Sequence, residues 1–140
     1  MQVMELMTEQ VMTVRPEETV DVAARLLSRG NVGALPVVDE HEAVVGMVTD
    51  RDLVVRCIAL GQNPTETLIS SVMTLGPLTA RPKEDAQMLA DKMGKLQVRR
   101  VPVVEQGRLR GIVSLSDLAR RDGSGAAEAL RNISRNISRR

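Results

Sequence analysis

Two short segments of the sequence each place a carboxylate three residues after a hydroxyl side chain. Thr49 and Asp52 form one pair, and Ser114 and Asp117 form the other. Each pair follows an apolar run and precedes a helical pattern. At a helix start both groups can bond free backbone N–H groups, which is a capping box. They can also serve a ligand, because a carboxylate accepts both hydrogen bonds of a ribose diol and a helix start attracts phosphate. Both interpretations stay open here.

The two pairs occupy equivalent positions of an internal repeat. A shift of 66 residues superimposes Met7-Thr8 on Met73-Thr74, Thr13 on Thr79, Arg15-Pro16 on Arg81-Pro82, and Pro36-Val37-Val38 on Pro102-Val103-Val104. After one deletion the shift becomes 65, and Gly46, Val48 and Asp52-Leu53 meet Gly111, Val113 and Asp117-Leu118. Ordered matches over about fifty positions indicate a duplication. We therefore expect one repeat with its linker over 1–65, a second over 66–122, and a tail over 123–140.

The first half of each repeat predicts a short extended segment followed by a helix. In the first copy Pro16 ends the extended segment, since the residue before proline avoids helical geometry. A helix then begins at Glu18 or Thr19 and ends at Gly30. Its predicted inward side chains are Val20, Ala23, Ala24 and Leu27.

The second half predicts a hairpin and another helix. Two apolar runs, 34–39 and 44–49, flank a polar turn, and Pro36 indicates a sheet edge or a bulge. Thr49 then opens a helix that ends by Gly61 and Pro64. Its predicted inward side chains are Leu53, Val54, Cys57 and Ile58. The fold class is α/β (α+β), with a β-α-β-β-α order in each copy. One copy is too small to bury its sheet faces, so we expect the two to pack as a pseudo-two-fold pair.

The ordered motifs, found twice, resemble the CBS domain, and the whole chain resembles a stand-alone tandem CBS pair, or Bateman module. The segments that carry the resemblance are Met7-Thr8, 13–16, 33–39 and 46–52 in the first copy, and Met73-Thr74, 79–82, 98–104 and 111–117 in the second. The resemblance implies a sensor that binds AMP, ADP, ATP or another adenosyl ligand in clefts between the repeats. It also implies a homodimer that regulates a partner protein and has no catalytic activity.

The same resemblance implies residue roles. Asp52 and Asp117 would hold ribose, with Thr49 and Ser114 near ribose or phosphate. The residues expected around the two adenines are Thr13, Gly33, Ala34, Leu35 and Pro36 in the first copy, and Thr79, Arg100, Val101 and Pro102 in the second. In the second copy, Arg99 and Arg100 occupy the positions of Gly33 and Ala34. An arginine side chain stays charged and can bind a phosphate through two hydrogen bonds. We expect the second site to prefer anionic nucleotides and the first to be weaker or to take a less charged ligand. Alternatively, both arginines are solvated charges at a strand edge.

The sequence predicts no catalytic centre. It has one His and one Cys. His41 lies in the acidic segment 39–42, which could be drawn as a metal site but is more typical of a polar turn. Cys57 lies on an apolar helix face. We expect no catalytic residues, no metal and no required cofactor.

The net positive charge of the chain lies in its tail. The whole chain has a net charge of +1 and no aromatic residues, whereas 120–140 holds six Arg against Asp122 and Glu128. The pattern of 126–140 predicts a helix with three interpretations: packing on the body or on a second subunit, a basic arm that binds nucleic acid or an acidic partner, and, least favoured, a membrane-surface helix. A scaffold protein that acts through this tail is the alternative function. The chain has no apolar run of about 18 residues and no signal-peptide pattern, so we expect a cytoplasmic protein without a membrane role.

Overall fold

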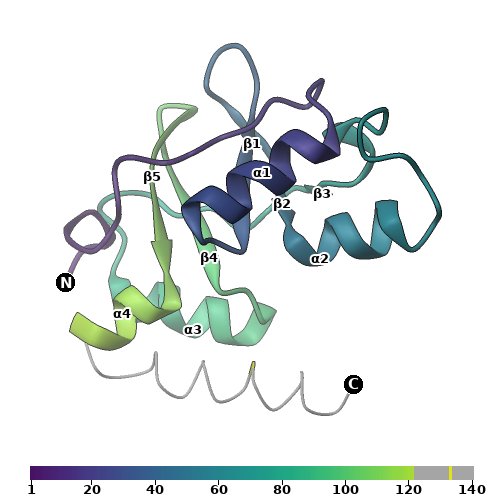
Figure 1. The fold of residues 1–140 in the computed structure, drawn as a ribbon. Helices are drawn as coiled ribbons and strands as arrows, with labels where there is room; N and C mark the ends of the chain where they lie inside the picture. The colour runs from purple at the N-terminus through teal and green to yellow at the C-terminus, as the bar shows by residue number, and fades with distance from the viewer. Residues whose placement is uncertain (122–132, 134–140) are drawn as a thin grey trace. The chain divides into compact units, whose positions relative to one another are not determined.

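The computed structural model describes residues 1–121 and 133, in two compact units (Figure 1). Unit 1 comprises Met1–Val11, Leu78–Gln106 and Arg110–Arg140, and unit 2 comprises Met12–Pro77 and Gly107–Leu109. The duplication therefore produces two units, as the self-comparison predicts. The bounds of the units, however, cut across the bounds of the sequence repeats.

Unit 2 contains the helix, the hairpin and the second helix of the first repeat in the predicted order, whereas the expected extended segment around 13–15 forms only an isolated bridge from Val14 to Val37. Its elements are α1 (Val20–Gly30), β1 (Ala34–Val38), β2 (Val44–Thr49), α2 (Asp50–Leu53), the π-helical turn η2 (Val54–Ile58), the 3-10 turn η3 (Ile69–Ser71) and β3 (Thr74–Leu75). The three strands form an antiparallel sheet in the order β1-β2-β3. The register shifts between Val37 and Val38, next to Pro36, and β1 ends the ladder. Both features fit the prediction made from Pro36.

Helix α1 begins and ends where the sequence predicts. Thr19 is its N-cap and Gly30 is its last residue, and the left-handed residue that follows is Asn31, with φ 50°. Asparagine tolerates this conformation better than most residues with a Cβ. The prediction for Ala24 is wrong, because that side chain is exposed, whereas the other three predicted inward residues are buried.

The second helix of the first repeat buries fewer residues than predicted. After Leu53 the chain continues as the π turn η2, in which Cys57 is buried. Val54 and Ile58 were expected inside but are 56% and 55% exposed. A π turn is wider than an α-helical turn, so the spacing that would align these side chains with the core is lost. Leu53 and Cys57 alone carry this segment's contact with the core.

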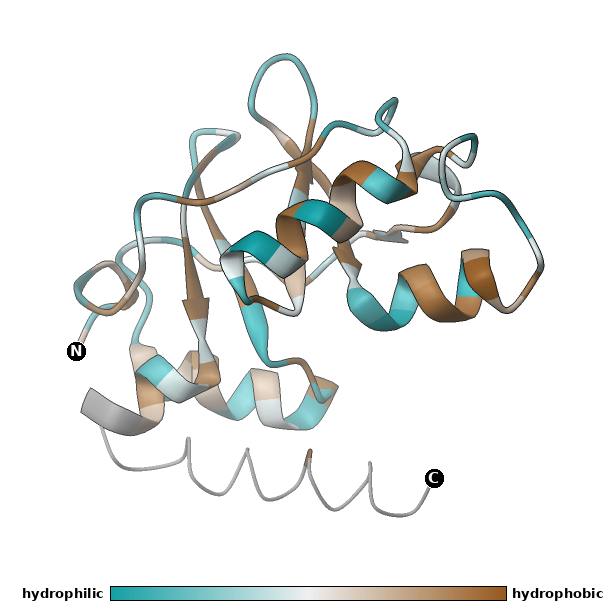
Figure 2. Cartoon of the chain, viewed as in Figure 1, coloured by the Kyte–Doolittle hydropathy of each residue, from teal (hydrophilic) through white to brown (hydrophobic). Residues whose placement is uncertain are grey.

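Unit 1 repeats the architecture with the second copy. Its elements are η1 (Val3–Glu5), α3 (Ala86–Leu96), β4 (Arg100–Glu105), β5 (Arg108–Ser114) and α4 (Leu115–Arg121). Helix α3 begins at the N-cap Asp85 and ends at Gln97 with φ 58°. Each unit has its own apolar cluster of buried aliphatic side chains. Figure 2 shows apolar colouring along the strands and alternating colours on α1, the pattern of a helix with one buried face.

Each unit is closed by the segment that precedes the other repeat. In unit 1 the N–H of Val3 donates to Glu84 O at 2.9 Å, and Thr8 and Ile112 exchange two backbone bonds of 2.8 and 2.9 Å. In unit 2 the N–H of Ile69 donates to Glu18 O at 2.8 Å, and β3 pairs with β2. Val3 and Ile69 are fully buried, each in its own cluster. The N-terminal segment and the linker are therefore exchanged between the repeats.

Two glycines make room for these segments. A Cβ on Gly46 would lie 2.9 Å from Thr74 O, and a Cβ on Gly111 would lie 2.8 Å from Thr8 O. The sulfur of the preceding methionine would lie 2.9 Å away in both cases. Any side chain would collide with backbone here, so only glycine permits the approach. The repeated Met-Thr and glycine motifs are thus contact partners.

Candidate functional site

The first candidate site is the junction between β2 and α2. Thr49 caps the helix: its Oγ1 accepts the N–H of Asp52 at 3.0 Å, and Asp52 Oδ2 accepts the N–H of Thr49 at 3.0 Å. Asp52 is only 9% exposed. The hydroxyl and the carboxylate are thereby held in one geometry.

The second candidate site, between β5 and α4, has the same arrangement. Ser114 Oγ accepts the N–H of Asp117 at 3.1 Å, and Asp117 Oδ2 accepts the N–H of Ser114 at 3.2 Å. Ser114 is 9% exposed. Both junctions are therefore capping boxes, and both carboxylates fold back onto their own helix starts, as the capping interpretation predicts. A carboxylate can accept about four hydrogen bonds, so a cap does not use up its capacity.

Arg56 joins the first junction to the linker that follows the repeat. Its Nε lies 3.9 Å from Asp52 Oδ1. Its Nη1 donates to Val72 O at 3.3 Å and to Met73 O at 3.1 Å. Sequence reasoning missed this residue, although its position four residues after Asp52 on the predicted helix was a usable signal. The carboxylate and the closing segment of unit 2 are thus held by one guanidinium group.

In each unit the structure brings the start of a strand beside its junction. Ala34 lies opposite Thr49 in the β1–β2 register, and the N–H of Asp50 donates to Gly33 O at 3.1 Å. In unit 1 the N–H of Leu115 donates to Arg99 O at 2.8 Å. The predicted base-contacting and ribose-contacting residues therefore meet at these points, at least at the level of the backbone.

The remaining predicted contact residues differ in accessibility. Leu35 and Val101 are core side chains, so only their backbone groups could meet a ligand; Pro36 and Pro102 are also buried. Thr13, Gly33, Ala34 and Arg100 are half-buried, and Thr79 and Arg99 are exposed. Val14 and Ala80, next to the two threonines, bridge to Val37 and Val103 in parallel. The two threonines therefore occupy matching positions in the two units.

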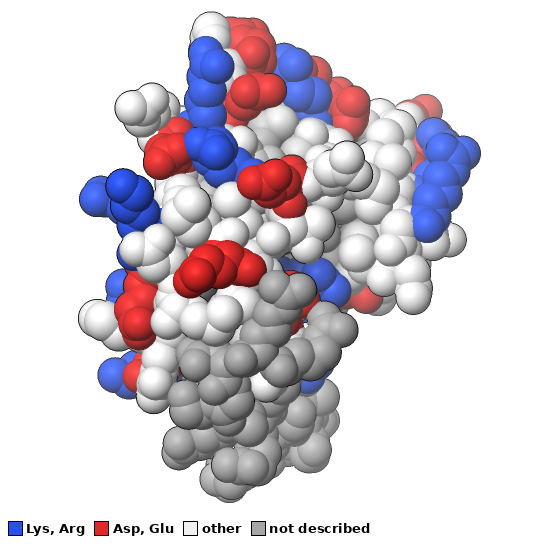
Figure 3. All heavy atoms as spheres, turned by 90° about the vertical axis from the view of Figure 1, so that its left-hand side faces the viewer, with Lys and Arg blue, Asp and Glu red and all other residues white. Residues whose placement is uncertain are grey.

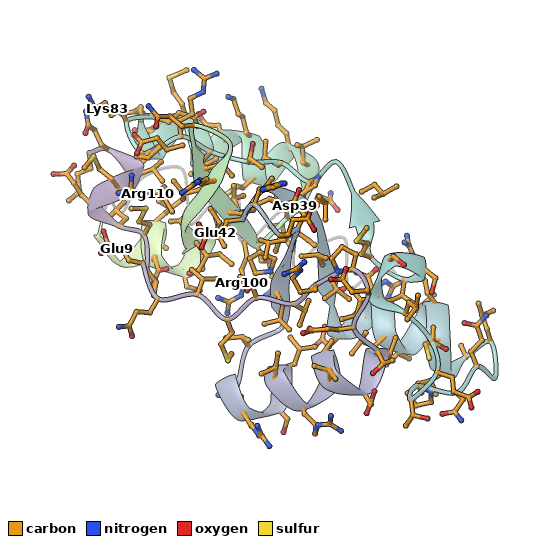
Figure 4. All side chains as sticks on the ribbon, turned by 90° about the horizontal axis from the view of Figure 1, so that it is seen from above. Glu9, Asp39, Glu42, Lys83, Arg100 and Arg110 are labelled. Atoms are coloured by element: carbon orange, nitrogen blue, oxygen red, sulfur yellow. The ribbon has the colours of Figure 1, made fainter. Side chains whose placement is uncertain are left out.

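The charges at the junctions are opposite. The first has Asp50 where the second has Leu115, and Gly33 and Ala34 where the second has Arg99 and Arg100. Figure 4 labels Arg100, at the start of β4. Asp50 is a residue that sequence reasoning passed over, although the repeat alignment already shows the difference. On the face in Figure 3, described acidic and basic side chains are interspersed.

The polar turn 39–42 is a self-contained structure. Asp39 Oδ1 accepts the N–H groups of His41 at 2.8 Å and Ala43 at 3.0 Å. Bonds from the N–H groups of Ala43 and His41 hold the pKa of the Asp39 carboxyl below its ordinary value. Within the residues that the structure describes, no group of three or more His, Cys, Asp and Glu side chains is placed to bind a metal ion. The described helices are all too short or too polar to cross a bilayer.

Comparisons with known proteins agree with the repeat structure. The family model "CBS domain" matches residues 3–58 and 69–124. The chain is 41% identical over 134 residues to the CBS domain-containing protein YhcV of Bacillus subtilis, covering 94% of each chain. It is 31% identical to the crystal structure of Hypoxic Response Protein I with two coordinated zinc ions, with a TM-score of 0.80 and coverage of 86% of this chain and 98% of that one. The hexameric CBS-CP12 protein from bloom-forming cyanobacteria is 30% identical, with a TM-score of 0.76 and coverage of 86% of this chain and 71% of that one.

Some relatives have enzyme names. An L-aspartate semialdehyde sulfurtransferase of Methanocaldococcus jannaschii is 34% identical over 119 residues, but the match covers 22% of its length. CBS domains in such proteins are one part of a longer chain. Their activities therefore do not transfer to this protein, and CBS domain proteins are usually regulatory.

Proposed function

The chain belongs to the CBS domain family, as a tandem pair of CBS domains, and on that premise we propose that it is a regulatory module that binds an adenosyl ligand. The ligand class is AMP, ADP, ATP or a related compound, bound at the two strand–helix junctions. The proposal includes a cytoplasmic homodimer without catalytic activity that acts on a partner protein.

One observation carries the proposal. Both junctions hold a hydroxyl and a carboxylate in the same fixed geometry, next to the start of a strand. A side chain fixed in this way loses no further rotamer freedom when it binds a ligand. The capping box alone explains the local structure. The repetition of the whole arrangement, in a family of regulatory proteins, favours the additional role.

Ligand binding can be tested without a label. The chain has no Trp or Tyr, so a purine that co-purifies would dominate its ultraviolet absorbance. We expect the melting temperature to rise on addition of adenosine or AMP, because a ligand that binds only the native state stabilises it. Inosine serves as the matched ligand control. If neither a co-purified purine nor a thermal shift is found, the sensor proposal fails.

The carboxylates are tested by conservative substitution. We expect Asp52→Asn and Asp117→Asn each to weaken binding by about tenfold, because the amide has no charge and replaces one acceptor oxygen by an NH₂ group that only donates. The amide oxygen can still accept the capping bond, so the folded state should survive. Glu66→Gln, which removes an exposed charge elsewhere in unit 2, is the control. Unchanged affinity in both Asn variants would assign the two acids to capping alone.

A homodimer is proposed on the exposed aliphatic side of η2. Val54, Val55, Ile58 and the nearby Leu60 are all exposed, and a second copy could bury them. The cyanobacterial relative, which is hexameric, supports assembly by chains of this kind. We expect Ile58→Asp to shift the sedimentation coefficient to that of a monomer. Leu96→Asp, at an exposed position on α3 in unit 1, is the control and should leave the dimer intact.

Part of the tail already has a structural role. Ile133 is helical, 3% exposed and a member of the apolar cluster of unit 1. This favours the interpretation that the tail packs on the body. The other predicted features of 123–140 lie outside the described residues.

A further inference from the structure

The carboxylate of Asp50 lies at the start of the strand that begins the first candidate site. Its Oδ2 and Oδ1 are 3.8 and 4.0 Å from the point where a Cβ on Gly33 would be. The backbone holds it there, because the N–H of Asp50 donates to Gly33 O. Asp50 is exposed. Its charge therefore faces any ligand that approaches Gly33 from solvent.

No ion pair balances this charge among the described residues. The described ion pairs of unit 2 involve other acids, including Asp52, whose partner is Arg56. Asp50 instead accepts the N–H of Arg51 at 2.8 Å. The negative charge is therefore reduced only by one backbone bond and by solvent.

The same contacts remove the backbone donors that a phosphate would use. The N–H of Asp50 is bonded to Gly33 O, that of Arg51 to Asp50 Oδ1, and that of Asp52 to Thr49 Oγ1. The first turn of α2 therefore has no free donor at these three positions. A phosphate here would meet a carboxylate and gain no backbone hydrogen bond from them.

The second repeat lacks this obstacle. Leu115 takes the place of Asp50 and is buried, and Arg99 takes the place of Gly33. No described residue accepts a bond from the N–H of Ser116, the counterpart of Arg51. The two junctions thus differ both in charge and in the supply of free backbone donors.

We propose that Asp50 makes the first repeat selective for adenosyl ligands without phosphate, such as a nucleoside or an adenosyl compound with a cationic substituent. This inference rests on the proposed function and names the ligand class of one of its two sites. Asp50 acts by repulsion: a like charge at the mouth of a site disfavours an anion more strongly as the anion gains charge. Adenosine is neutral, so the Asp50 carboxylate does not repel it.

The test is a titration of the full chain, followed by NMR. The amide of Gly33 reports the first site and the amide of Arg99 reports the second in the same sample. Adenosine, AMP and ATP are titrated separately at equal ionic strength. In the wild type we expect the Gly33 signal to respond to adenosine at lower concentration than to AMP, and to ATP last.

Removal of the charge should reverse that order. We expect Asp50→Asn to raise the affinity for AMP, measured at the Gly33 signal, by about three- to tenfold. The affinity for ATP should rise by more, because the repulsion by the Asp50 carboxylate grows with the negative charge of the ligand. Adenosine affinity should change by less than about twofold. Asp50→Leu, which copies the second repeat, should give the same result. The control Glu66→Gln removes an exposed charge elsewhere in unit 2 and should leave the AMP-to-adenosine ratio unchanged.

The outcomes separate the two proposals. In one outcome, adenosine shifts the Gly33 signal while the ratio of AMP affinity to adenosine affinity is the same in Asp50→Asn and in the wild type. That result would contradict the role of Asp50 but would support the ligand site. If none of the three compounds shifts either reporter, the proposed function fails and the selectivity with it. If Asp50→Asn changed the ratio of AMP affinity to adenosine affinity equally at the Gly33 and Arg99 signals, the assignment to Asp50 would also be overturned.

Discussion

Unit 1 and unit 2 are closed in the same way but by different parts of the chain. Unit 2 is completed by the linker, whose Thr74 pairs with Met47, and unit 1 by the segment before the first repeat, whose Thr8 pairs with Ile112. The hydrogen bonds and the buried anchors are equivalent. The comparison therefore isolates the effect of sequence separation, since contacts that close a longer loop cost more conformational entropy to form.

The largest expected effect comes from the buried anchors. Ile69→Ala should cost about 2–5 kcal/mol of unfolding free energy, and Val3→Ala about 1–3, because each removes buried methyl groups and leaves a cavity. We expect hydrogen exchange to accelerate in unit 1 for Val3→Ala and in unit 2 for Ile69→Ala. Met4→Ala, at an exposed position of the same turn, is the control. Loss of protection in the opposite unit would show that the segments are not exchanged.

The glycines give the next effect. Gly111→Ala and Gly46→Ala should each cost about 1–3 kcal/mol, because the new methyl group meets a backbone carbonyl. The N-terminal segment, whose contacts close the longer loop, should detach more readily in Gly111→Ala than the linker does in Gly46→Ala. A Glu-specific protease should then cut at Glu5 and Glu9 faster than in Gly46→Ala. Gly33→Ala, where the nearest atom is 3.8 Å away, is the control, and equal cutting rates in all three variants would contradict the effect of loop length.

The caps should give a smaller and equal effect in the two units. Thr49→Val and Ser114→Ala each remove one side-chain bond to a helix N–H group, so each should lower the unfolding free energy by about 1 kcal/mol. Urea titration measures this directly. A cost in unit 2 that is much larger than in unit 1 would indicate that the Asp52–Arg56 contact depends on the cap.

Acid should produce the smallest difference, and in unit 2. The Thr19 hydroxyl, which donates to Asp21, lowers the pKa of that carboxyl, with Arg25 adding to the effect, and backbone N–H groups lower the pKa of Asp39. A lowered folded-state pKa stabilises the fold above the ordinary carboxyl range, and this stability is lost as pH falls through the folded values. We expect unit 2 to lose protection as pH falls below the ordinary range of carboxyl pKa values. The double variant Asp21→Asn, Asp39→Asn should make the protection of unit 2 depend less on pH in this range.

Sequence alone predicted the repeat and the order of helices and hairpins, and it offered the capping box as one of two interpretations of each junction, because these depend on local patterns. It did not predict that Val54 and Ile58 face solvent, since the π turn that moves them has no distinct pattern. The sequence also did not predict that each Met-Thr segment packs against the other repeat. The repeat alignment contains the Met7-Thr8 motif and Gly111 as two separate matches, and it does not show that the two are in contact. Long-range pairing is set by tertiary packing, which a periodic pattern does not encode.

The exchange of closing segments also sets an order of assembly during translation. The N-terminal segment is synthesised well before its partner strand β5, since its partner Ile112 lies near the end of the described chain. Unit 2, by contrast, has all of its sheet strands once β3 has emerged. The N-terminal segment, with Val3 and Leu6, must therefore wait with its apolar side chains uncovered, a period in which nascent chains are prone to aggregate.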